Sequence, residues 1–281
     1  MTYRIPGLND GLSPDASSAK TGASFALPTG LRRAARRMLD VILPPHCLKC
    51  GVGVDEPGSL CPQCWEAVTF LSPPHCARCG LPFDFDVGAD ALCAACIRRP
   101  PVYERARAVF VYDDASRDLI LSFKHADRTE AAPAFGRWLA RAGADLAAEA
   151  DIVMPVPLHW IRFWRRRYNQ SALLAHAFVR ARAEILPDTA PPAVIPDLLI
   201  RHRRTASQGG LGPAGRTRNV RGAFRINPRF QTRLRGARIL IVDDVYTTGA
   251  TAEACARVLL RAGAGAVDVL TLARVVKTRT D

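Results

Sequence analysis

The chain has little lysine and no long apolar run. Only four of its 39 basic residues are lysines, and the others are arginines. No apolar stretch approaches the roughly 20 residues that a bilayer-spanning helix needs. The arginine cluster within residues 32–37 precedes only a short apolar stretch, which Asp40 and Pro44 interrupt, so a secretory signal is disfavoured. We therefore expect a cytoplasmic protein with no transmembrane segment.

The two commonest nucleotide-binding loops are also missing. No Gly-x-Gly-x-x-Gly follows a strand-like run, and Gly-x-x-x-x-Gly-Lys-Ser/Thr does not occur. A Rossmann dinucleotide loop and a P-loop are therefore disfavoured. In other respects the composition is ordinary: 281 residues, 48% hydrophobic and 23% charged, indicate one or two globular domains with a substantial core.

The positive charge is unevenly distributed. The formal net charge is +13, of which residues 1–100 contribute +1 and residues 101–281 contribute +12. Between Asp197 and Arg235 the chain has ten arginines and a single acidic residue. Such a segment attracts phosphate groups, either of a small substrate or of a nucleic acid.

Cysteine, in contrast, is abundant and regularly placed. Eight of the nine cysteines form four Cys-x-x-Cys pairs: Cys47/Cys50, Cys61/Cys64, Cys76/Cys79 and Cys93/Cys96. Disulfides are rare in the cytosol, and a redox role explains one such pair but not four. Four thiolates from two such turns suit tetrahedral Zn²⁺. We predict two structural Zn²⁺ ions and leave open which pairs share an ion. Cys255 stands alone and is expected to be a small buried residue.

These features divide the chain into four parts. Residues 1–28 lack periodicity and are expected to be disordered. Residues 29–45 have apolar residues at helical spacing between arginines, which predicts a short basic amphipathic helix. This helix is expected to pack against the cysteine-rich module rather than lie on a membrane surface. The module itself spans 46–100, and Pro100-Pro101 marks its boundary with a second domain, 101–281.

The second domain alternates short apolar strands with helices. Strands are expected at 108–112, 152–154, 237–242 and 266–273, and helices at 117–124, 128–150, 169–183 and 251–262. This alternation predicts an α/β fold with a doubly wound parallel sheet, whose ligands bind at the carboxyl ends of the strands. The loops that follow Met154 and Val242 both lie at such ends.

The run from Ile239 to Thr251, Ile-Leu-Ile-Val-Asp-Asp-Val-Tyr-Thr-Thr-Gly-Ala-Thr, is the most informative part of the chain. A buried strand leads into an acidic pair, and a small hydroxyl-rich loop leads into a helix. Loop amides and a helix N-terminus suit a phosphate, and a glycine lets it approach the backbone closely. Carboxylates suit sugar hydroxyls or a hard cation such as Mg²⁺. The combination predicts a site for a phosphorylated ribose.

This run resembles the signature with which type I phosphoribosyltransferases bind phosphoribosyl pyrophosphate. The resemblance implies that Asp243 and Asp244 hold the ribose hydroxyls and that Thr247, Thr248, Gly249, Ala250 and Thr251 hold the 5-phosphate, with Mg²⁺ accompanying the ligand. It implies that the loop Pro155-Val156-Pro157, followed by arginines that include Arg166, takes the pyrophosphate. Segment 201–221, which contains Arg216, would close over the site.

Further motifs narrow the resemblance to the competence protein ComF family. Pro155-Val156-Pro157-Leu158-His159 and Arg166-Arg167-Tyr168-Asn169-Gln170 are similar to that family's Pro-Val-Pro and Arg-Gly-Phe-Asn-Gln elements. Phe123-Lys124-His125 and the block 205–224 also look like family elements, as does the order of a double zinc ribbon before a phosphoribosyltransferase domain. The resemblance implies a role in natural transformation, on the cytoplasmic side of DNA uptake.

Two departures from the patterns affect the expected chemistry. Arg167 and Tyr168 stand where the family has Gly and Phe. Thr247 stands where purine phosphoribosyltransferases have an acidic general base, and a threonine does not accept a proton near neutral pH.

Three functions remain open at the level of the sequence. The first is transfer of ribosyl phosphate to a nitrogen nucleophile, and no residue identifies the acceptor. The second is a non-catalytic module that binds single-stranded DNA through its basic segment. The third is a zinc-ribbon scaffold that docks other competence proteins.

Overall fold

The computed structural model describes residues 44–125, 129–159, 168–205 and 212–276. The predicted disordered segment 1–28 lies outside the described residues, and so does the predicted helix 29–45 apart from Pro44 and Pro45. From Pro45 onward the chain forms one compact unit. The boundary predicted between residues 100 and 101 therefore lies inside a single packed body and stays a prediction.

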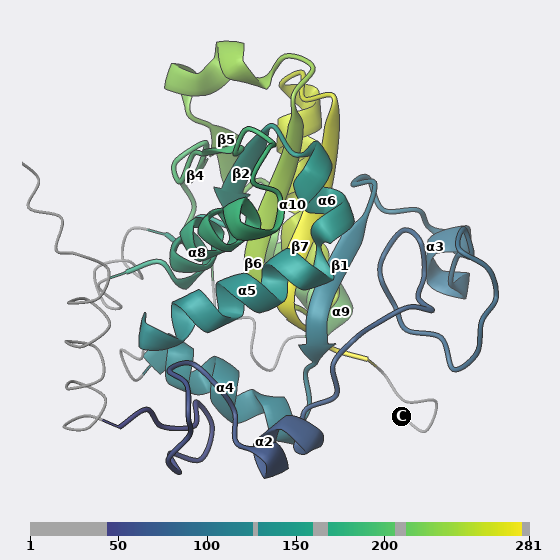
Figure 1. The fold of residues 1–281 in the computed structure, drawn as a ribbon. Helices are drawn as coiled ribbons and strands as arrows, with labels where there is room; N and C mark the ends of the chain where they lie inside the picture. The colour runs from purple at the N-terminus through teal and green to yellow at the C-terminus, as the bar shows by residue number, and fades with distance from the viewer. Residues whose placement is uncertain (1–43, 126–128, 160–167, 206–211, 277–281) are drawn as a thin grey trace, which may run out of the picture. The chain divides into compact units, whose positions relative to one another are not determined.

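A five-stranded parallel sheet forms the centre of this unit (Figure 1). Its strands are β1 (Ala106–Val111), β2 (Ile152–Pro155), β3 (Ala193–Val194), β6 (Arg238–Tyr246) and β7 (Ala266–Arg274), in the spatial order β1-β7-β6-β2-β3. All nine residues of β7 are buried. A parallel sheet covered on both faces has strands that are apolar throughout, and the short apolar runs of the sequence reflect this.

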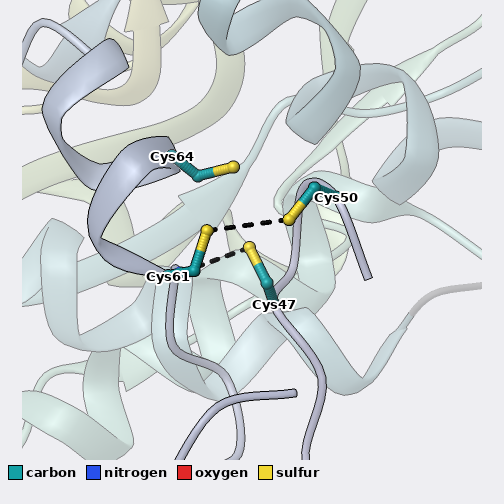
Figure 2. Close-up of side chains that lie close together, drawn as sticks. All are labelled: Cys47, Cys50, Cys61 and Cys64. Atoms are coloured by element: carbon teal, nitrogen blue, oxygen red, sulfur yellow. Dashed lines mark hydrogen bonds between the residues drawn. The ribbon is translucent and has the colours of Figure 1, made fainter. Parts of the chain in front are cut away.

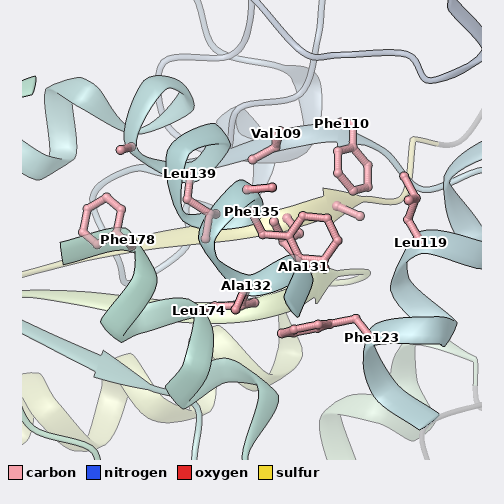
Figure 3. Packing of buried hydrophobic residues seen from close by; sticks show 14 of the residues in the cluster. Val109, Phe110, Leu119, Phe123, Ala131, Ala132, Phe135, Leu139, Leu174 and Phe178 are labelled. Atoms are coloured by element: carbon pink, nitrogen blue, oxygen red, sulfur yellow. The ribbon is translucent and has the colours of Figure 1, made fainter. Parts of the chain in front are cut away.

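Helices cover both faces of the sheet. On one face α5 (Ala132–Ala142), α6 (Ala144–Glu149) and α8 (Gln170–Ile185) pack against the strands, with α4 (Asp114–His125) and the 3₁₀ turn η1 (Thr129–Ala131) beside them. Figure 3 shows this apolar layer, in which Phe123, Phe135 and Phe178 meet Leu139 and Leu174. On the other face lies α10 (Ala250–Arg261), against which α9 (Pro213–Val220) packs.

Alternate residues of each strand enter the two layers. In β6, Leu240 and Val242 join the α5–α8 layer, whereas Ile239 and Ile241 join the α10 layer. This follows from the period of two in a β-strand, where successive side chains point to opposite faces. The predicted doubly wound fold is confirmed.

Several predicted boundaries differ from the structure. The expected helix 128–150 is divided by Gly143 into α5 and α6, and β6 continues to Tyr246, so that both carboxylates lie within the strand. The short pieces β3, β4 (Leu199–Arg201), β5 (Phe224–Ile226) and η2 (Pro228–Leu234), together with α9, were not predicted. They are too short for a hydrophobic period to reveal them, and tertiary contacts decide their conformation.

The cysteine-rich module lies along the edge strand β1. It contains two short helices, α2 (Pro62–Ala67) and α3 (Ala94–Arg98). Between its two halves the chain pairs antiparallel with β1: Phe70 faces Phe110, and Leu71 N donates to Val109 O at 2.8 Å. The module thereby covers hydrogen-bonding groups of β1 that would otherwise present an open sheet edge.

The crossing of α5 and α8 yields a stability prediction. A Cβ added at Gly136 would lie 2.5 Å from the carbonyl carbon and oxygen of Ala177 on α8, so Gly136→Ala must push the two helices apart. We expect a loss of about 1–3 kcal/mol in the free energy of unfolding, measured by urea denaturation. Gly53→Ala, where an added Cβ meets nothing within 4 Å, is the control and should be nearly neutral. A stabilised Gly136→Ala variant, as at an exposed helical position, would contradict the close contact.

Candidate functional site

Two clusters of four cysteines form the candidate metal centres. They are Cys47/Cys50/Cys61/Cys64 and Cys76/Cys79/Cys93/Cys96, and within each cluster the sulfur atoms all lie within 4.8 Å of one another. Figure 2 shows the first cluster, where the sulfurs of Cys50 and Cys61 are 3.6 Å apart. In the second, Cys79 and Cys93 are 3.7 Å apart. A tetrahedron with Zn–S bonds of about 2.3 Å requires a sulfur separation of about 3.8 Å, so both clusters fit structural Zn²⁺.

The structure settles the pairing that the sequence left open. The first two Cys-x-x-Cys turns along the chain supply one complete cluster, and the last two supply the other. The turns are tight, since Gly51 and Gly80 have φ of 75° and 70°. Against the effect of burial, backbone N–H groups lower the pKa of Cys47 to about 6, and the amide of Cys61 donates to its sulfur at 3.3 Å. A lowered pKa favours the thiolate that a metal ligand must be.

The carboxyl ends of β2 and β6 form the candidate ligand site. The strands pair in parallel with Pro155 opposite Val242, and Val156 N donates to Val242 O at 2.9 Å. From β2 the chain returns through α8 to β3, and from β6 it returns through α10 to β7 on the opposite side. The gap between these strands is therefore the switch point of a doubly wound sheet, where ligands bind. The loop after Pro155 and the last part of β6 from Asp243 flank it.

The acidic pair is held by a lysine and a serine. Asp243 Oδ1 accepts from Ser171 Oγ at 3.0 Å and from the amide of Asp244 at 2.9 Å. Lys124 Nζ lies 2.9 Å from Asp244 Oδ2 in a pair that is about one-fifth exposed on each side. Burial, with the charge of Asp244 beside it, raises the pKa of Asp243 to about 7. Carboxylate oxygens of this kind fit a hard cation or sugar hydroxyls.

The Tyr168-Asn169-Gln170 motif orients the groups around the acidic pair. Tyr168 Oη donates to Phe123 O at 3.0 Å, and Gln170 Nε2 donates to Lys124 O at 3.2 Å. Asn169 Nδ2 donates to Val156 O at 3.2 Å, and its Oδ1 accepts from Ser171 N as the N-cap of α8. The motif thus joins the end of α4, the loop after β2 and the start of α8.

Lys124 and Ser171 are site residues that sequence reasoning missed. The Phe-Lys-His element was noted, but its role was not predicted, because a salt bridge between α4 and β6 leaves no local pattern. Ser171 follows the recognised motif directly and could have been found by extending that motif one residue.

The hydroxyl-rich loop leads directly into a helix, and its predicted contacts to a phosphate stay a prediction. Gly249 is the N-cap of α10 with φ 74°, and Ala250 and Thr251 form the first helical turn. Glu253 N donates to Gly249 O at 2.8 Å. The leading N–H groups of a helix have no carbonyl partner within it, and they favour an anion.

The remaining predicted residues are placed as follows. Thr247 is partly buried and Thr248 is exposed, both in the turn between β6 and α10. Arg216 is partly buried on α9, which packs against α10. Arg166 lies outside the described residues. The structure therefore brings the segments after β2 and β6 together at the carboxyl ends of the strands, and it places Arg216 in the helix layer of α9 and α10.

Comparison with known proteins identifies the family. A family model, double zinc ribbon domain, matches residues 38–101. "DNA utilization protein YhgH" of Escherichia coli (strain K12) is 34% identical over 234 residues, which cover 81% of this chain and 89% of that protein. "Competence protein F" of Haemophilus influenzae is 28% identical over 65% of this chain and 78% of its own length. The chain belongs to the ComF family.

The chain is similar to two further known proteins. "Competence protein ComFC" of Bacillus subtilis (strain 168) is 26% identical over 66% of this chain and 72% of that protein. Among solved structures, an orotate phosphoribosyltransferase of Mycobacterium tuberculosis matches with a TM-score of 0.30 at 18% identity, over 59% of this chain and 69% of that one. In the part of the ComF-family chain that the structure describes, no helix is both long and apolar enough to cross a bilayer.

The raised pKa of Asp243 gives a pH-dependent prediction. Folding shifts this pKa from 3.8 to about 7, so the folded state holds the proton more tightly. The resulting stabilisation is complete at low pH and is lost as the pH rises through this window. Relative to Asp243→Asn, the wild-type free energy of unfolding should fall by up to about 1.4 kcal/mol per pH unit. Urea denaturation across the window measures this slope.

A matched control is available on α4. Asp118 is exposed, and Asp118→Asn should leave the wild-type slope in place. If the slopes of wild type and Asp243→Asn are equal, the carboxyl of Asp243 titrates normally and its burial beside Asp244 is refuted.

Proposed function

We propose that this ComF-family protein binds phosphoribosyl pyrophosphate with Mg²⁺ at the β2–β6 switch point and transfers its ribosyl phosphate to a nitrogen nucleophile. The observation that carries the proposal is that three elements lie together at the carboxyl ends of β2 and β6. They are an acidic pair, a loop that begins a helix, and the Pro-Val-Pro loop. Phosphoribosyl pyrophosphate has ribose hydroxyls between two anionic groups, the 5-phosphate and the pyrophosphate. The three elements offer one binding partner for each of these groups.

Each part of the ligand has a chemical counterpart. The carboxylates of Asp243 and Asp244 would accept hydrogen bonds from the ribose hydroxyls, and the amides that follow Gly249 would hold the 5-phosphate. The backbone of Pro155, Val156 and Pro157 would border the pyrophosphate, with Mg²⁺ supplying charge neutralisation to the leaving group. Lys124, which is paired with Asp244, places a cation beside the acidic pair.

The reaction we propose needs no proton acceptor at Thr247. A threonine hydroxyl has no basic form near neutral pH, so the acceptor nitrogen must be nucleophilic without deprotonation there. An amine meets this condition better than a purine ring nitrogen. The rate would come from separation and stabilisation of charge at the departing pyrophosphate rather than from general-base catalysis.

The proposed biological setting is natural transformation, in the cytoplasm. The support is family membership: one relative is named a DNA utilization protein and two are named competence proteins. We include other competence proteins among the proposed partners, since the double zinc ribbon presents exposed apolar side chains such as Phe85 and Ile97.

Calorimetric titration of phosphoribosyl pyrophosphate with Mg²⁺ tests the site. Wild type should bind in the micromolar range, and the double variant Asp243→Asn, Asp244→Asn should lose about 2–4 kcal/mol of binding free energy, because charge-assisted hydrogen bonds to the ligand are removed. The control is Asp114→Asn, Asp118→Asn, which makes the same charge change at two exposed positions on α4. No binding by zinc-loaded wild type would refute the proposed function.

A second candidate function is binding of single-stranded DNA. The observation that favours it is the exposure of eight arginines between β4 and β6: Arg203, Arg204, Arg218, Arg221, Arg225, Arg229, Arg233 and Arg235. Phe224 is buried and Phe230 is partly buried, so aromatic stacking on bases has little support there. Binding to this surface would be electrostatic and independent of sequence.

The salt dependence of DNA affinity tests this candidate. Replacing two phosphate-binding arginines, Arg218→Ala and Arg225→Ala, should reduce the slope of log affinity against log salt by about 0.7 for each phosphate of a single strand that the protein no longer neutralises. Arg98→Ala with Arg99→Ala, two exposed arginines of the zinc module, should leave the slope as it is. Equal slopes in all three proteins, from fluorescence anisotropy with labelled oligonucleotide, would exclude this surface.

A further inference from the structure

Arg274 connects the second cysteine cluster to the sheet. This arginine ends β7 and is only 7% exposed. Its Nη1 donates to the carbonyl of Cys79, and its Nη2 lies 3.6 Å from the sulfur of the same residue. A buried guanidinium requires a nearby negative partner, and a zinc-bound set of four thiolates has a net negative charge.

The same guanidinium also contacts Tyr246, at the end of β6. Arg274 Cζ lies 4.9 Å from the centroid of the Tyr246 ring, which is a cation–π distance. The strands hold the two residues in register, and Val275 N donates to Tyr246 O at 2.9 Å. The tyrosine hydroxyl lies 2.6 Å from that of Tyr103, so its ring is fixed at both ends.

Tyr246 in turn fills the space beneath the hydroxyl-rich loop. It immediately precedes Thr247, and its ring lies against Gly249. A Cβ added at Gly249 would come within 2.4 Å of the tyrosine hydroxyl oxygen and 2.8 Å of its Cζ. The left-handed φ of Gly249 and the position of the Tyr246 ring therefore set the shape of the loop together.

The first cysteine cluster has different surroundings. Cys47, Cys61 and Cys64 join the apolar layer around α5, and neighbouring Trp65 packs against Phe70 and Trp138. These contacts are apolar and lie in the layer of α5, whereas Tyr246 packs in the layer of α10. The first cluster thus contacts the apolar layer of α5, whereas the second cluster contacts Arg274 and, through it, Tyr246.

We propose that the second zinc site and the hydroxyl-rich loop at Thr247, Thr248 and Gly249 are coupled through Arg274 and Tyr246. Arg274 is then a positioning residue: it touches no ligand itself but holds Tyr246, which holds the loop at Gly249. Occupancy of the Cys76/Cys79/Cys93/Cys96 site would stabilise the ligand-binding shape of the loop, and strain in the loop would weaken retention of that zinc, since coupling is reciprocal. The part of this inference that concerns ligand affinity rests on the proposed function, and the zinc part does not.

The first experiment needs no ligand. Zinc release to a chromogenic chelator is followed over time in Gly249→Ala, where the new Cβ displaces Tyr246, and in Gly236→Ala. Gly236 has a similar φ of 70° but nothing within 4 Å of an added Cβ, so it reproduces the backbone strain without the displacement. We expect each protein to release two Zn²⁺ per chain, and we expect the release rates of Gly236→Ala to equal those of wild type. In Gly249→Ala, one of the two ions should be released about fivefold faster than in wild type. A rate change of this size corresponds to a modest loss of stability at one site. Unchanged release, or equal acceleration of both ions, would overturn the coupling.

The second experiment compares two arginines that both contact the second zinc module. Arg274→Lys keeps the charge but loses the planar fork that spans Cys79 and Tyr246. Arg107→Lys is the matched control, because Arg107 Nη1 donates to Ala77 O at 3.1 Å in the same module and does not belong to the Tyr246 contact. Calorimetry should show phosphoribosyl pyrophosphate binding with Mg²⁺ weakened about tenfold in Arg274→Lys only.

The two experiments separate the possible failures. Equal weakening in both lysine variants, or none in Arg274→Lys, would mean that Arg274 only anchors the module and would overturn its positioning role. If wild type binds no phosphoribosyl pyrophosphate, the proposed function fails, while zinc release from Gly249→Ala still decides whether the site and the loop are coupled.

Discussion

The parallel pairing of β2 with β6 is the constraint on which the rest of the site depends. β2 ends at Pro155, opposite Val242, whereas β6 continues to Tyr246, and the chain leaves the two strands on opposite faces through α8 and α10. Because side-chain direction alternates along a strand, a slip of one residue would move every apolar side chain of β6 into the wrong layer. The burial of Leu240 and Ile241 in different layers therefore fixes where Asp243 lies.

Around that pairing, the site is assembled from polar contacts between distant parts of the chain. Lys124 reaches Asp244 from α4, Ser171 reaches Asp243 from α8, and Asn169 holds the loop at Val156. Such bonds contribute only about 0.5–1.5 kcal/mol each between neutral groups and about 1.5–3 kcal/mol when a charged group takes part, so they orient the groups and do not drive folding. Folding is driven by the two apolar layers, and the polar network uses the frame that they provide.

The zinc module packs against the central sheet within one compact unit. Its central segment pairs with β1, and its first half adds Trp65 and Phe70 to the aromatic cluster around Trp138. Its second half reaches Arg274 through Cys79. A small cysteine-rich segment has too little core to be stable alone, and metal ligation together with docking on a larger sheet makes up this deficit.

The metal clusters and the main motif of the candidate site could be predicted from the sequence, because each depends on residues that are close together along the chain. Cys-x-x-Cys turns bind metal through residues three apart, and the run from Ile239 to Thr251 contains strand, acidic pair and helix start in one continuous segment, so both were predicted from residue types and spacing. The long elements were found by their hydrophobic period. The short strand β3 and the β4–β5 hairpin were not, because their conformation comes from pairing partners elsewhere in the chain. The sequence by itself determined the eight cysteines of the two metal clusters, the acidic pair and the hydroxyl-rich loop that leads into a helix. Only the tertiary structure decided which cysteine pairs form each cluster, since identical motifs can be paired in more than one way. It alone also decided that Lys124 and Ser171 meet the acidic pair and that Arg274 joins a zinc cluster to Tyr246, since these contacts join residues that are far apart along the chain and leave no period or motif.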